Sequence, residues 1–299
     1  MKCAFITGIS GYIGSHLARD LLKKGYKVCG LVRQPLHTEY LTAFRNRINL
    51  FTYDGSYESV LQAVKASKPD VVYHMATYYA VCHSSDQITE MCRCNLILGN
   101  YVLEAMKTCR IENIVYPSTA SCHYDNESYN PLNLYAATKQ AFSDVMRYYT
   151  EACGVRSITL ALTDSYGPND NRPKVLNLIK KAYCEDQSIG LSDGKQIYDV
   201  LYIDDIIHAL ELAGDLLERQ KENSSAYQIY SRNPLSLRET VDLLQKTAGA
   251  RIEVKWGARP QAARSLRGKI RVDPLLPEWQ AQISLEEGLK RFWYNSVEL

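Results

Sequence analysis

The sequence predicts an α/β fold, a doubly wound parallel sheet with a smaller C-terminal α/β region. Short apolar runs alternate with helix-like segments over the first half, a glycine-rich turn follows the first run, and the pattern becomes irregular after residue 168. Such alternation is typical of parallel strands buried between two helical layers. We expect a nucleotide-binding domain over residues 1–163 and a substrate-binding region over 164–299, segments of which can return to the first domain.

The N-terminal segment has the pattern of a dinucleotide-binding unit. An apolar run over residues 2–7 leads into Gly8-Ile-Ser-Gly11-Tyr-Ile-Gly14, then into a helical pattern and a second apolar run from Lys27. The first glycine permits the tight bend, the second lets backbone approach a pyrophosphate, and the third lets the helix pack closely. The helix N-terminus attracts the phosphates. Between a strand and a helix, these glycines predict a Rossmann-type unit rather than an ordinary turn. We assign to the cofactor site Gly8, Ser10, Gly11, Tyr12, Ile13 and Gly14.

The end of the second apolar run indicates which dinucleotide is bound. An NAD site usually has an acidic residue there, which accepts hydrogen bonds from the adenosine ribose. This chain has Leu31-Val-Arg33-Gln34-Pro35 instead. A guanidinium suits a 2′-phosphate through its charge and paired hydrogen bonds. The sequence therefore favours NADP(H), and NAD(H) is the alternative if Arg33 is only a solvated loop residue.

The following elements repeat the alternation. Further strands are predicted near 47–53, 70–75, 112–116 and 156–162, and helices near 56–67, 86–109 and 134–153. Parallel sheets of this kind bind ligands at the carboxyl ends of their strands. We expect the ligand cleft at that edge, between the sheet and the C-terminal region.

Tyr135 and Lys139 form a candidate catalytic pair. They are four residues apart in Leu134-Tyr-Ala-Ala-Thr-Lys139, about one helical turn, so both side chains share one helix face. A cation beside a phenol favours the phenolate and lowers the tyrosine pKa toward useful acid strength. The chain contains 22 tyrosines, so a chance pair on a solvated helix face is the alternative.

Charge and composition exclude several classes of protein. The 35 basic and 33 acidic residues give a net charge of +2 without a long run of one sign, so no nucleic-acid partner is expected. Nine cysteines without a CxxC pair argue against a disulfide framework. We interpret Cys92-Arg-Cys94 as buried thiols rather than a metal site. No apolar segment reaches about 18 residues, so we predict a cytoplasmic protein that does not enter membranes.

Several motifs in order resemble the extended short-chain dehydrogenase/reductase family. They are Gly8-x-x-Gly11-x-x-Gly14, Asp70-Val-Val-Tyr-His-Met-Ala76, Ser118-Thr119, the Tyr135/Lys139 pair, Tyr166-Gly-Pro168 and Asp204-Asp205 after Val200-Leu-Tyr-Ile. The similarity covers most of the chain and is greatest to the nucleotide-sugar-modifying branch, which includes sugar epimerases, 4,6-dehydratases and 4-ketoreductases.

The resemblance implies roles for individual residues. Tyr135 would be the acid/base, Lys139 would bind the nicotinamide ribose and lower the tyrosine pKa, and Thr119 would hydrogen-bond the reacting oxygen. For His74, a packed residue is a simpler interpretation than a role in proton transfer. Asn95 matches an asparagine of the family that is structural. The cofactor would also contact Asp54, Gly55, Met75, Ala76, Thr77, Pro117 and Leu162. The substrate would contact Tyr78, Ser118, Thr119, Asp164, Tyr198 and Arg259.

Departures from the family pattern narrow the expected reaction. Ala120 and Ser121 stand where 4,6-dehydratases of the family have Asp and Glu, so dehydration is not expected. Cys122 lies one residue later than the cysteine of the epimerase-reductases that make GDP-fucose. Tyr198 replaces an arginine and Asp164 an asparagine of the family, which puts the usual diphosphate contacts in doubt. Arg264, Arg267 and Lys269 are either further phosphate ligands or a solvated basic loop.

The short segment between Thr119 and Tyr135 is most similar to reductases of the CDP-abequose and CDP-paratose synthase type. The expected function is NADPH-dependent reduction of the 4-keto group of a nucleotide-activated 4-keto-6-deoxyhexose, in deoxysugar biosynthesis such as supplies lipopolysaccharide. The alternatives are a nucleotide-sugar 4-epimerase with bound NAD and a non-catalytic NAD(P)-sensing protein. The resemblance also implies a homodimer packed through the helices that contain Leu103 and Met146.

Overall fold

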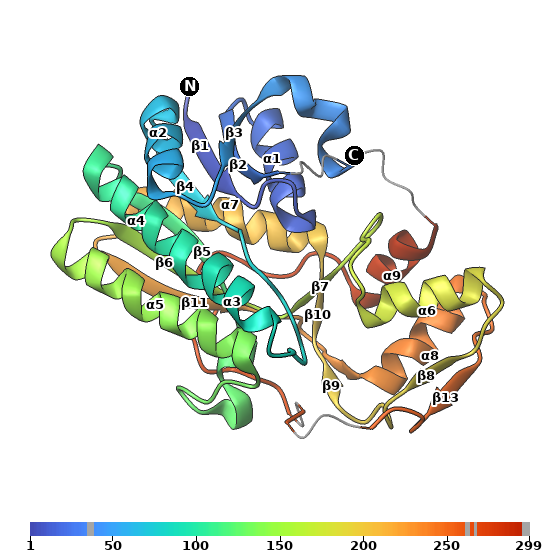
Figure 1. The fold of residues 1–299 in the computed structure, drawn as a ribbon. Helices are drawn as coiled ribbons and strands as arrows, with labels where there is room; N and C mark the ends of the chain where they lie inside the picture. Colours follow the sequence, from blue (N-terminus) through green and yellow to red (C-terminus); the bar gives the residue numbers. More distant parts are fainter. Residues whose placement is uncertain (35–38, 261–263, 266–267, 295–299) are drawn as a thin grey trace.

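A seven-stranded sheet in which every pairing is parallel forms the centre of the protein (Figure 1). The computed structural model describes residues 1–34, 39–260, 264–265 and 268–294. The strand order is β11-β6-β5-β4-β1-β2-β3. Its strands are β1 (Cys3–Thr7), β2 (Lys27–Arg33), β3 (Ile48–Tyr53), β4 (Val71–His74), β5 (Asn113–Thr119), β6 (Arg156–Leu162) and β11 (Ser224–Ile229). The predicted doubly wound α/β fold is confirmed.

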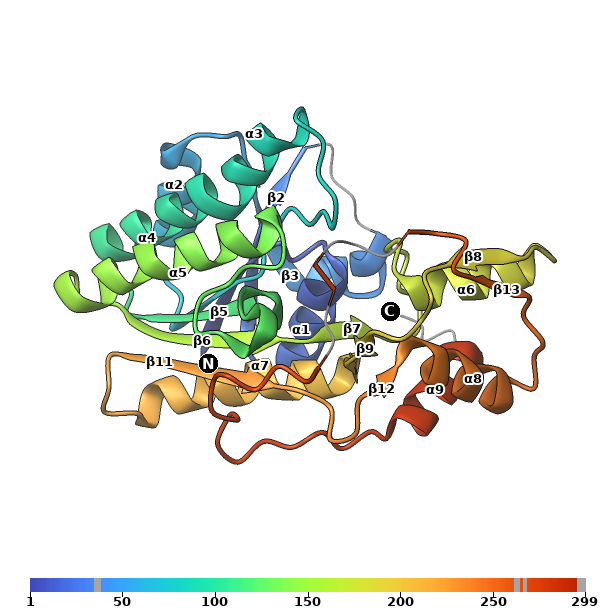
Figure 2. The same cartoon turned by 90° about the horizontal axis from the view of Figure 1, so that it is seen from below.

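Helices cover both faces of this sheet (Figure 2). One face is covered by α1 (Tyr12–Lys23) and α7 (Ile203–Arg219), and the other by α2 (Tyr57–Ser67), α4 (Leu98–Cys109) and α5 (Leu134–Ala152). The central strand shows why both layers form. Ala4 and Ile6 pack into the cluster with α1 and α7, whereas Cys3 and Phe5 pack into the other cluster. Successive side chains of a strand point to opposite faces, so an uninterrupted apolar strand needs cover on both sides.

One helical stretch differs from the prediction of a single helix near 86–109. It consists of α3 (Gln87–Cys92), a π-helical turn over Arg93–Ile97, and α4. A π turn inserts an extra residue into the helical repeat and often occurs at functional sites. Here the turn contains Asn95, whose side chain is buried.

The C-terminal region packs beside the sheet's carboxyl edge (Figures 1 and 2). It contains the helices α6 (Val175–Cys184), α8 (Leu237–Ala248) and α9 (Leu285–Tyr294). Its short strands are β7 (Asp164–Tyr166), β8 (Ile189–Leu191), β9 (Ile197–Tyr198), β10 (Val200–Tyr202), β12 (Leu235–Ser236) and β13 (Val254–Trp256). Two elements after residue 163 return to the large sheet. Strand β11 pairs in parallel with β6, and α7 lies in the connection between these two strands and covers the sheet.

Asp205 ties the start of α7 to the C-terminal segment. Its buried carboxylate accepts hydrogen bonds from the backbone N–H groups of Gln282 (2.8 Å) and Ile283 (3.1 Å). Asp205→Ala should lower the free energy of unfolding by about 2–3 kcal/mol, because two N–H groups lose their acceptor. Urea unfolding measures this. Asp204→Ala is the control, since exposed Asp204 lies 3.9 Å from Arg291 and such pairs contribute about 0–1 kcal/mol. Equal losses in both variants would contradict the prediction.

Candidate active site

A cavity of about 860 Å³ lies at the carboxyl edge of the sheet. Thr7, Arg33, Tyr53, Thr119 and Leu162, each the last residue of a strand, line it. The C-terminal region supplies the opposite wall. The predicted residues that line this cavity are Gly8, Ser10, Gly11, Tyr12, Ile13, Gly14, Arg33, Met75, Ala76, Thr77, Pro117, Ser118, Thr119, Tyr135, Lys139, Leu162, Asp164 and Tyr198.

The glycine turn is shaped to accept a dinucleotide. Gly8 has φ +68°, and a Cβ there would lie 2.7 Å from the backbone nitrogen of Ala76. A Cβ at Gly14 would lie 2.3 Å from the carbonyl oxygen of Gly8. Gly11 is the N-cap of α1 and provides no side-chain cap, so the first N–H groups of α1 have no side-chain acceptor at the cap. Backbone without side chains at a helix N-terminus fits the pyrophosphate of NAD(P).

Arg33 lies at the end of β2, where the sequence predicts recognition of the adenosine ribose. Its side chain lines the cavity and forms an ion pair with Glu90 of α3. The two side chains are 58% and 38% exposed. The structure therefore places a carboxylate beside the guanidinium that the sequence assigns to a 2′-phosphate.

Helix α5 presents Tyr135 and Lys139 to the cavity. The helix begins at Leu134 because the Asn133 side chain caps it, accepting a hydrogen bond from the N–H of Ala136 (2.9 Å). Lys139, one turn after Tyr135, is 3% exposed, and its Nζ lies 4.2 Å from the centroid of the Tyr116 ring. The Tyr135 ring packs edge-on against Tyr79, with centroids 4.9 Å apart.

Thr119 enters the same cavity from the end of β5. Its Oγ1 accepts a hydrogen bond from the N–H of Ser121 (3.2 Å), which fixes the side chain at the start of a short 3₁₀ helix, Ala120–Cys122. Ser118 lies behind it, with its Oγ 3.9 Å from Cys122 Sγ. Strand β5 and helix α5 thus bring the three predicted catalytic residues to one cavity.

The role of Lys139 in lowering the Tyr135 pKa stays a prediction, because burial dominates the pKa of this phenol in the structure. Burial raises the pKa of the Tyr135 phenol, and a hydrogen bond with the Thr77 side chain opposes this only in part. Burial also lowers the pKa of Lys139 to about 7, with Cys122 and Cys94 acting in the opposite direction. The amine is thus only partly charged near neutrality, and Tyr135 stays protonated.

Asn95 and His74 have structural roles. Asn95 accepts hydrogen bonds from Thr77 Oγ1 (3.1 Å) and the Tyr78 N–H (2.7 Å), and donates to the Tyr78 carbonyl (3.0 Å) and Thr138 Oγ1 (2.9 Å). It therefore fixes the loop after β4 to α5, one residue before Lys139. His74 is buried against Tyr116 and Phe142, and burial lowers its pKa to about 3.

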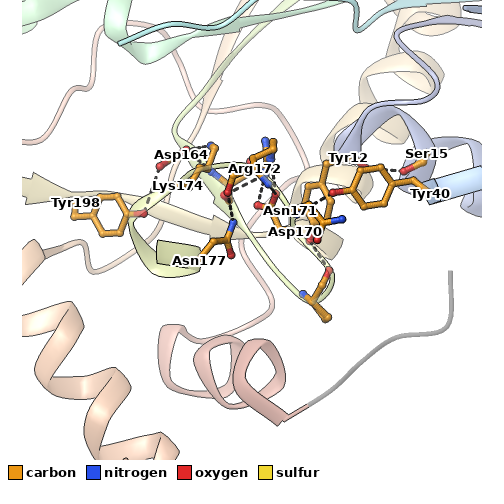
Figure 3. Close-up of polar contacts among 12 residues, drawn as sticks. Tyr12, Ser15, Tyr40, Asp164, Asp170, Asn171, Arg172, Lys174, Asn177 and Tyr198 are labelled. Carbon is orange, nitrogen blue, oxygen red and sulfur yellow. Dashed lines mark hydrogen bonds and ion pairs between the residues drawn. The ribbon is translucent and has the colours of Figure 1, made fainter. Parts of the chain in front are cut away.

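A second polar group, which Figure 3 shows, also lines the cavity through Asp164, Arg172, Lys174 and Tyr198. The Asp164 carboxylate forms an ion pair with Lys174 and accepts a hydrogen bond from the Tyr198 hydroxyl (3.4 Å). Burial alone would raise the pKa of Asp164, but Lys174 and Arg172 hold it below its ordinary value. The Arg172 guanidinium donates to both Asp170 oxygens (2.7 and 2.6 Å) and lies 4.5 Å from the centroid of the Tyr12 ring. Sequence patterns did not predict Arg172 or Lys174, which flank Pro173 in an irregular loop.

The segment around Lys269 closes one side of the cavity. Gly268, Lys269, Ile270 and Arg271 line it. Asn126 fixes this segment, donating to the Lys269 carbonyl (2.9 Å) and accepting from the Arg271 N–H (2.8 Å). Arg271 Nη2 donates to Asp199 Oδ2 at 3.1 Å. Of the predicted basic loop, Lys269 thus reaches the cavity, Arg264 contacts Asn130, and Arg267 lies outside the described residues.

Four predicted contact residues are not among those that line the cavity. Asp54 is exposed and accepts hydrogen bonds from the N–H (2.8 Å) and Oγ (2.6 Å) of Ser56, in a turn before α2 that also contains Gly55. The Tyr78 backbone is bound to Asn95. Arg259 is exposed, and its N–H donates to the Leu191 carbonyl (3.1 Å) in the β8–β13 region.

Other predicted features concern thiols, metals and membranes. Cys92 and Cys94 are free thiols, Cys94 buried and Cys92 half-buried, as predicted for packed cysteines. Within the described ranges, no group of three or more His, Cys, Asp or Glu side chains is placed to hold a metal ion. None of the described helices has the length and apolar character needed to cross a membrane.

Comparisons with known proteins agree with this geometry. The sequence pattern of the NAD dependent epimerase/dehydratase family matches residues 4–229. The CDP-abequose synthase of Yersinia pseudotuberculosis is 30% identical over 69% of this chain and 70% of its own length. That of Salmonella muenchen is 23% identical over 97% and 96%. The crystal structure of UDP-glucuronic acid 4-epimerase from Bacillus cereus, in complex with UDP-glucuronic acid and NAD, is 22% identical, with a TM-score of 0.84 over 97% of this chain and 98% of that one.

Proposed function

The chain belongs to the NAD dependent epimerase/dehydratase family, in the nucleotide-sugar-modifying branch of the extended short-chain dehydrogenases/reductases, and from this premise we propose that it is an NADPH-dependent 4-ketoreductase. The substrate is a nucleotide-activated 4-keto-6-deoxyhexose. The observation that carries the proposal is the set of Thr119, Tyr135 and Lys139 in one cavity with the glycine turn, without the two acids that dehydration requires at positions 120 and 121.

The placement of the Tyr135 and Thr119 hydroxyls supports reduction. When bound, the nicotinamide supplies the hydride. A ketone that gains hydride develops negative charge on its oxygen, so it needs a proton donor and a hydrogen-bond donor at that atom. The Tyr135 and Thr119 hydroxyls line one cavity, so the phenol can donate the proton and the threonine can donate a hydrogen bond to the same oxygen. A 4-epimerase, by contrast, must also begin by removing a proton from a sugar hydroxyl.

Basic side chains in the cavity support a substrate with a diphosphate. Arg172, Lys174, Lys269 and Arg271 line the cavity, although three of them are already paired with Asp170, Asp164 and Asp199. Arginine and lysine bind phosphate oxygens by charge-assisted hydrogen bonds. The names of the two CDP-abequose synthases favour CDP as the nucleotide.

Turnover with defined substrates tests the proposed function. We expect the absorbance of NADPH to fall when the protein is mixed with a CDP-linked 4-keto-6-deoxyhexose, and not with the corresponding 4-hydroxy sugar. The dTDP, GDP and UDP series define the nucleotide preference. Absence of NADPH oxidation with all four series, in protein that binds the cofactor, would overturn the proposal.

A nucleotide-sugar 4-epimerase with bound NAD is the second candidate. The Bacillus cereus 4-epimerase binds NAD and has the same fold, and Glu90 beside Arg33 disfavours a 2′-phosphate. Denaturing the purified protein and identifying the released nucleotide separates the two, since stoichiometric NAD would favour epimerisation.

We also propose that the protein is cytoplasmic and that it forms a homodimer through α4 and α5. Leu103 and Met146 are buried against the sheet within one protomer, so they are not themselves the dimer contacts. A dimer must use the outer faces of these helices, where Tyr148 is exposed. Light scattering on the purified protein measures the mass.

A further inference from the structure

At the adenosine end of the proposed cofactor site, the end of β2 has no acidic residue of its own, but Arg33 there pairs with an acid from α3. In NAD-binding units an acidic residue at the end of the second strand accepts hydrogen bonds from the ribose hydroxyls. Here that position is Arg33, and the carboxylate comes instead from Glu90 on α3, which is 57 positions later in the chain. Arg33 lines the cavity and Glu90 is not among the lining residues, so the carboxylate lies behind the guanidinium, next to the cavity.

This ion pair should affect the binding of NADPH and of NADH differently. A 2′-phosphate carries about −1.5 to −2 charges near neutral pH. To bind it, Arg33 must share its guanidinium with Glu90 or leave it, and the phosphate must approach a carboxylate of like charge. A ribose 2′-hydroxyl has no charge, and it can donate a hydrogen bond to a carboxylate. Arg33 thus favours NADPH, and Glu90 opposes that preference.

We propose that Glu90 is a specificity-determining residue that weakens the discrimination by Arg33 between NADPH and NADH. This inference rests on the proposed function only in requiring a nicotinamide dinucleotide in the cavity. The exposed part of each side chain leaves room for the guanidinium to turn toward a ligand, because Arg33 is 58% exposed. Exposed pairs of this kind contribute little to stability, so the protein tolerates the loss of either partner.

Glu90→Gln tests the proposal by cofactor binding, measured by calorimetry with NADPH and with NADH in the absence of sugar nucleotide. We expect the dissociation constant for NADPH to fall about five- to tenfold, since an exposed pair is broken and a like charge is removed. The constant for NADH should change less than about twofold. The selective gain should shrink as salt is raised, because the charges are at the surface.

Two further variants make the test specific. The first adds Glu90→Gln to a protein that already carries Arg33→Met. There the gain in the logarithm of the NADPH affinity should be less than half of the gain in wild type, because no guanidinium remains to be freed. Glu151→Gln is the matched control. It removes a carboxylate from another exposed ion pair, with Arg147 (2.8 Å) on α5, and should change neither constant.

The outcomes are distinguishable from those of the turnover assay. Equal shifts for NADPH and NADH, or a loss of NADH affinity without a gain for NADPH, would overturn the role of Glu90 even if the protein reduces keto sugars. A selective NADPH gain in protein that turns over no keto sugar would support Glu90 and overturn only the proposed reaction.

Discussion

Tyr135→Phe should lower kcat for keto-sugar reduction by about 10²- to 10⁴-fold, the usual contribution of a positioned proton donor. The variant keeps the ring that packs against Tyr79 and loses only the hydroxyl. Binding of NADPH should change little, because the glycine turn and Arg33 are untouched. Single-turnover absorbance measurements separate the chemical step from cofactor binding.

Tyr79→Phe is the matched control for this prediction. It removes a neighbouring phenol from the same cavity and the same aromatic contact. A large loss in Tyr135→Phe beside a loss of less than about tenfold in Tyr79→Phe would assign the proton transfer to Tyr135. If the biological role survives Tyr135→Phe without turnover, the protein is a dinucleotide sensor rather than an enzyme.

The pKa of Tyr135 shows what the sequence can and cannot predict about this site. The spacing of Tyr135 and Lys139 correctly predicts that both lie on α5 and face one cavity. It cannot predict the degree of burial, because the packing partners Tyr79 and Tyr116 come from other segments of the chain. Burial changes the sign of the expected pKa shift.

Local patterns predicted the sheet and its glycine turn because each depends on residues that are near in sequence. Strand periodicity and the spacing of Gly8, Gly11 and Gly14 are of this kind. The contacts of Arg33 with Glu90 and of Arg271 with Asp199 span 57 and 72 residues and leave no local pattern. Asp54 differs, because its hydrogen bonds to Ser56 are local, and its contact with adenine stays a prediction.

Lys139→Met should stabilise the free protein while lowering kcat/KM by about 10²-fold or more, since the amine that would bind the cofactor ribose is lost. Burial lowers the pKa of Lys139 from its ordinary 10.5 to about 7, so the charged amine is costly to bury, by an amount on the order of 5 kcal/mol. The contact with the Tyr116 ring favours the charged form, but such contacts are worth only about 0.5–2 kcal/mol. An apolar side chain of similar length avoids the cost.

The stabilisation should depend on pH in a definite direction. Below about pH 7 Lys139 is charged in both the folded and unfolded chains, so the full cost is present. Between about 7 and 10.5 the unfolded chain binds more protons than the folded one, so the free energy of unfolding of the wild type rises with pH through this group. The advantage of Lys139→Met should therefore be largest below pH 7 and decline as pH approaches 10.

Urea unfolding of wild type and variant at several pH values measures this difference. Lys65→Met, which removes an exposed cation from α2, is the control and should change the free energy of unfolding by less than about 0.5 kcal/mol at every pH. A Lys139→Met protein that is less stable than wild type below pH 7 would mean that favourable contacts of the ammonium outweigh its burial. In the expected case, the protein retains a buried lysine at a cost in stability because the reaction requires it.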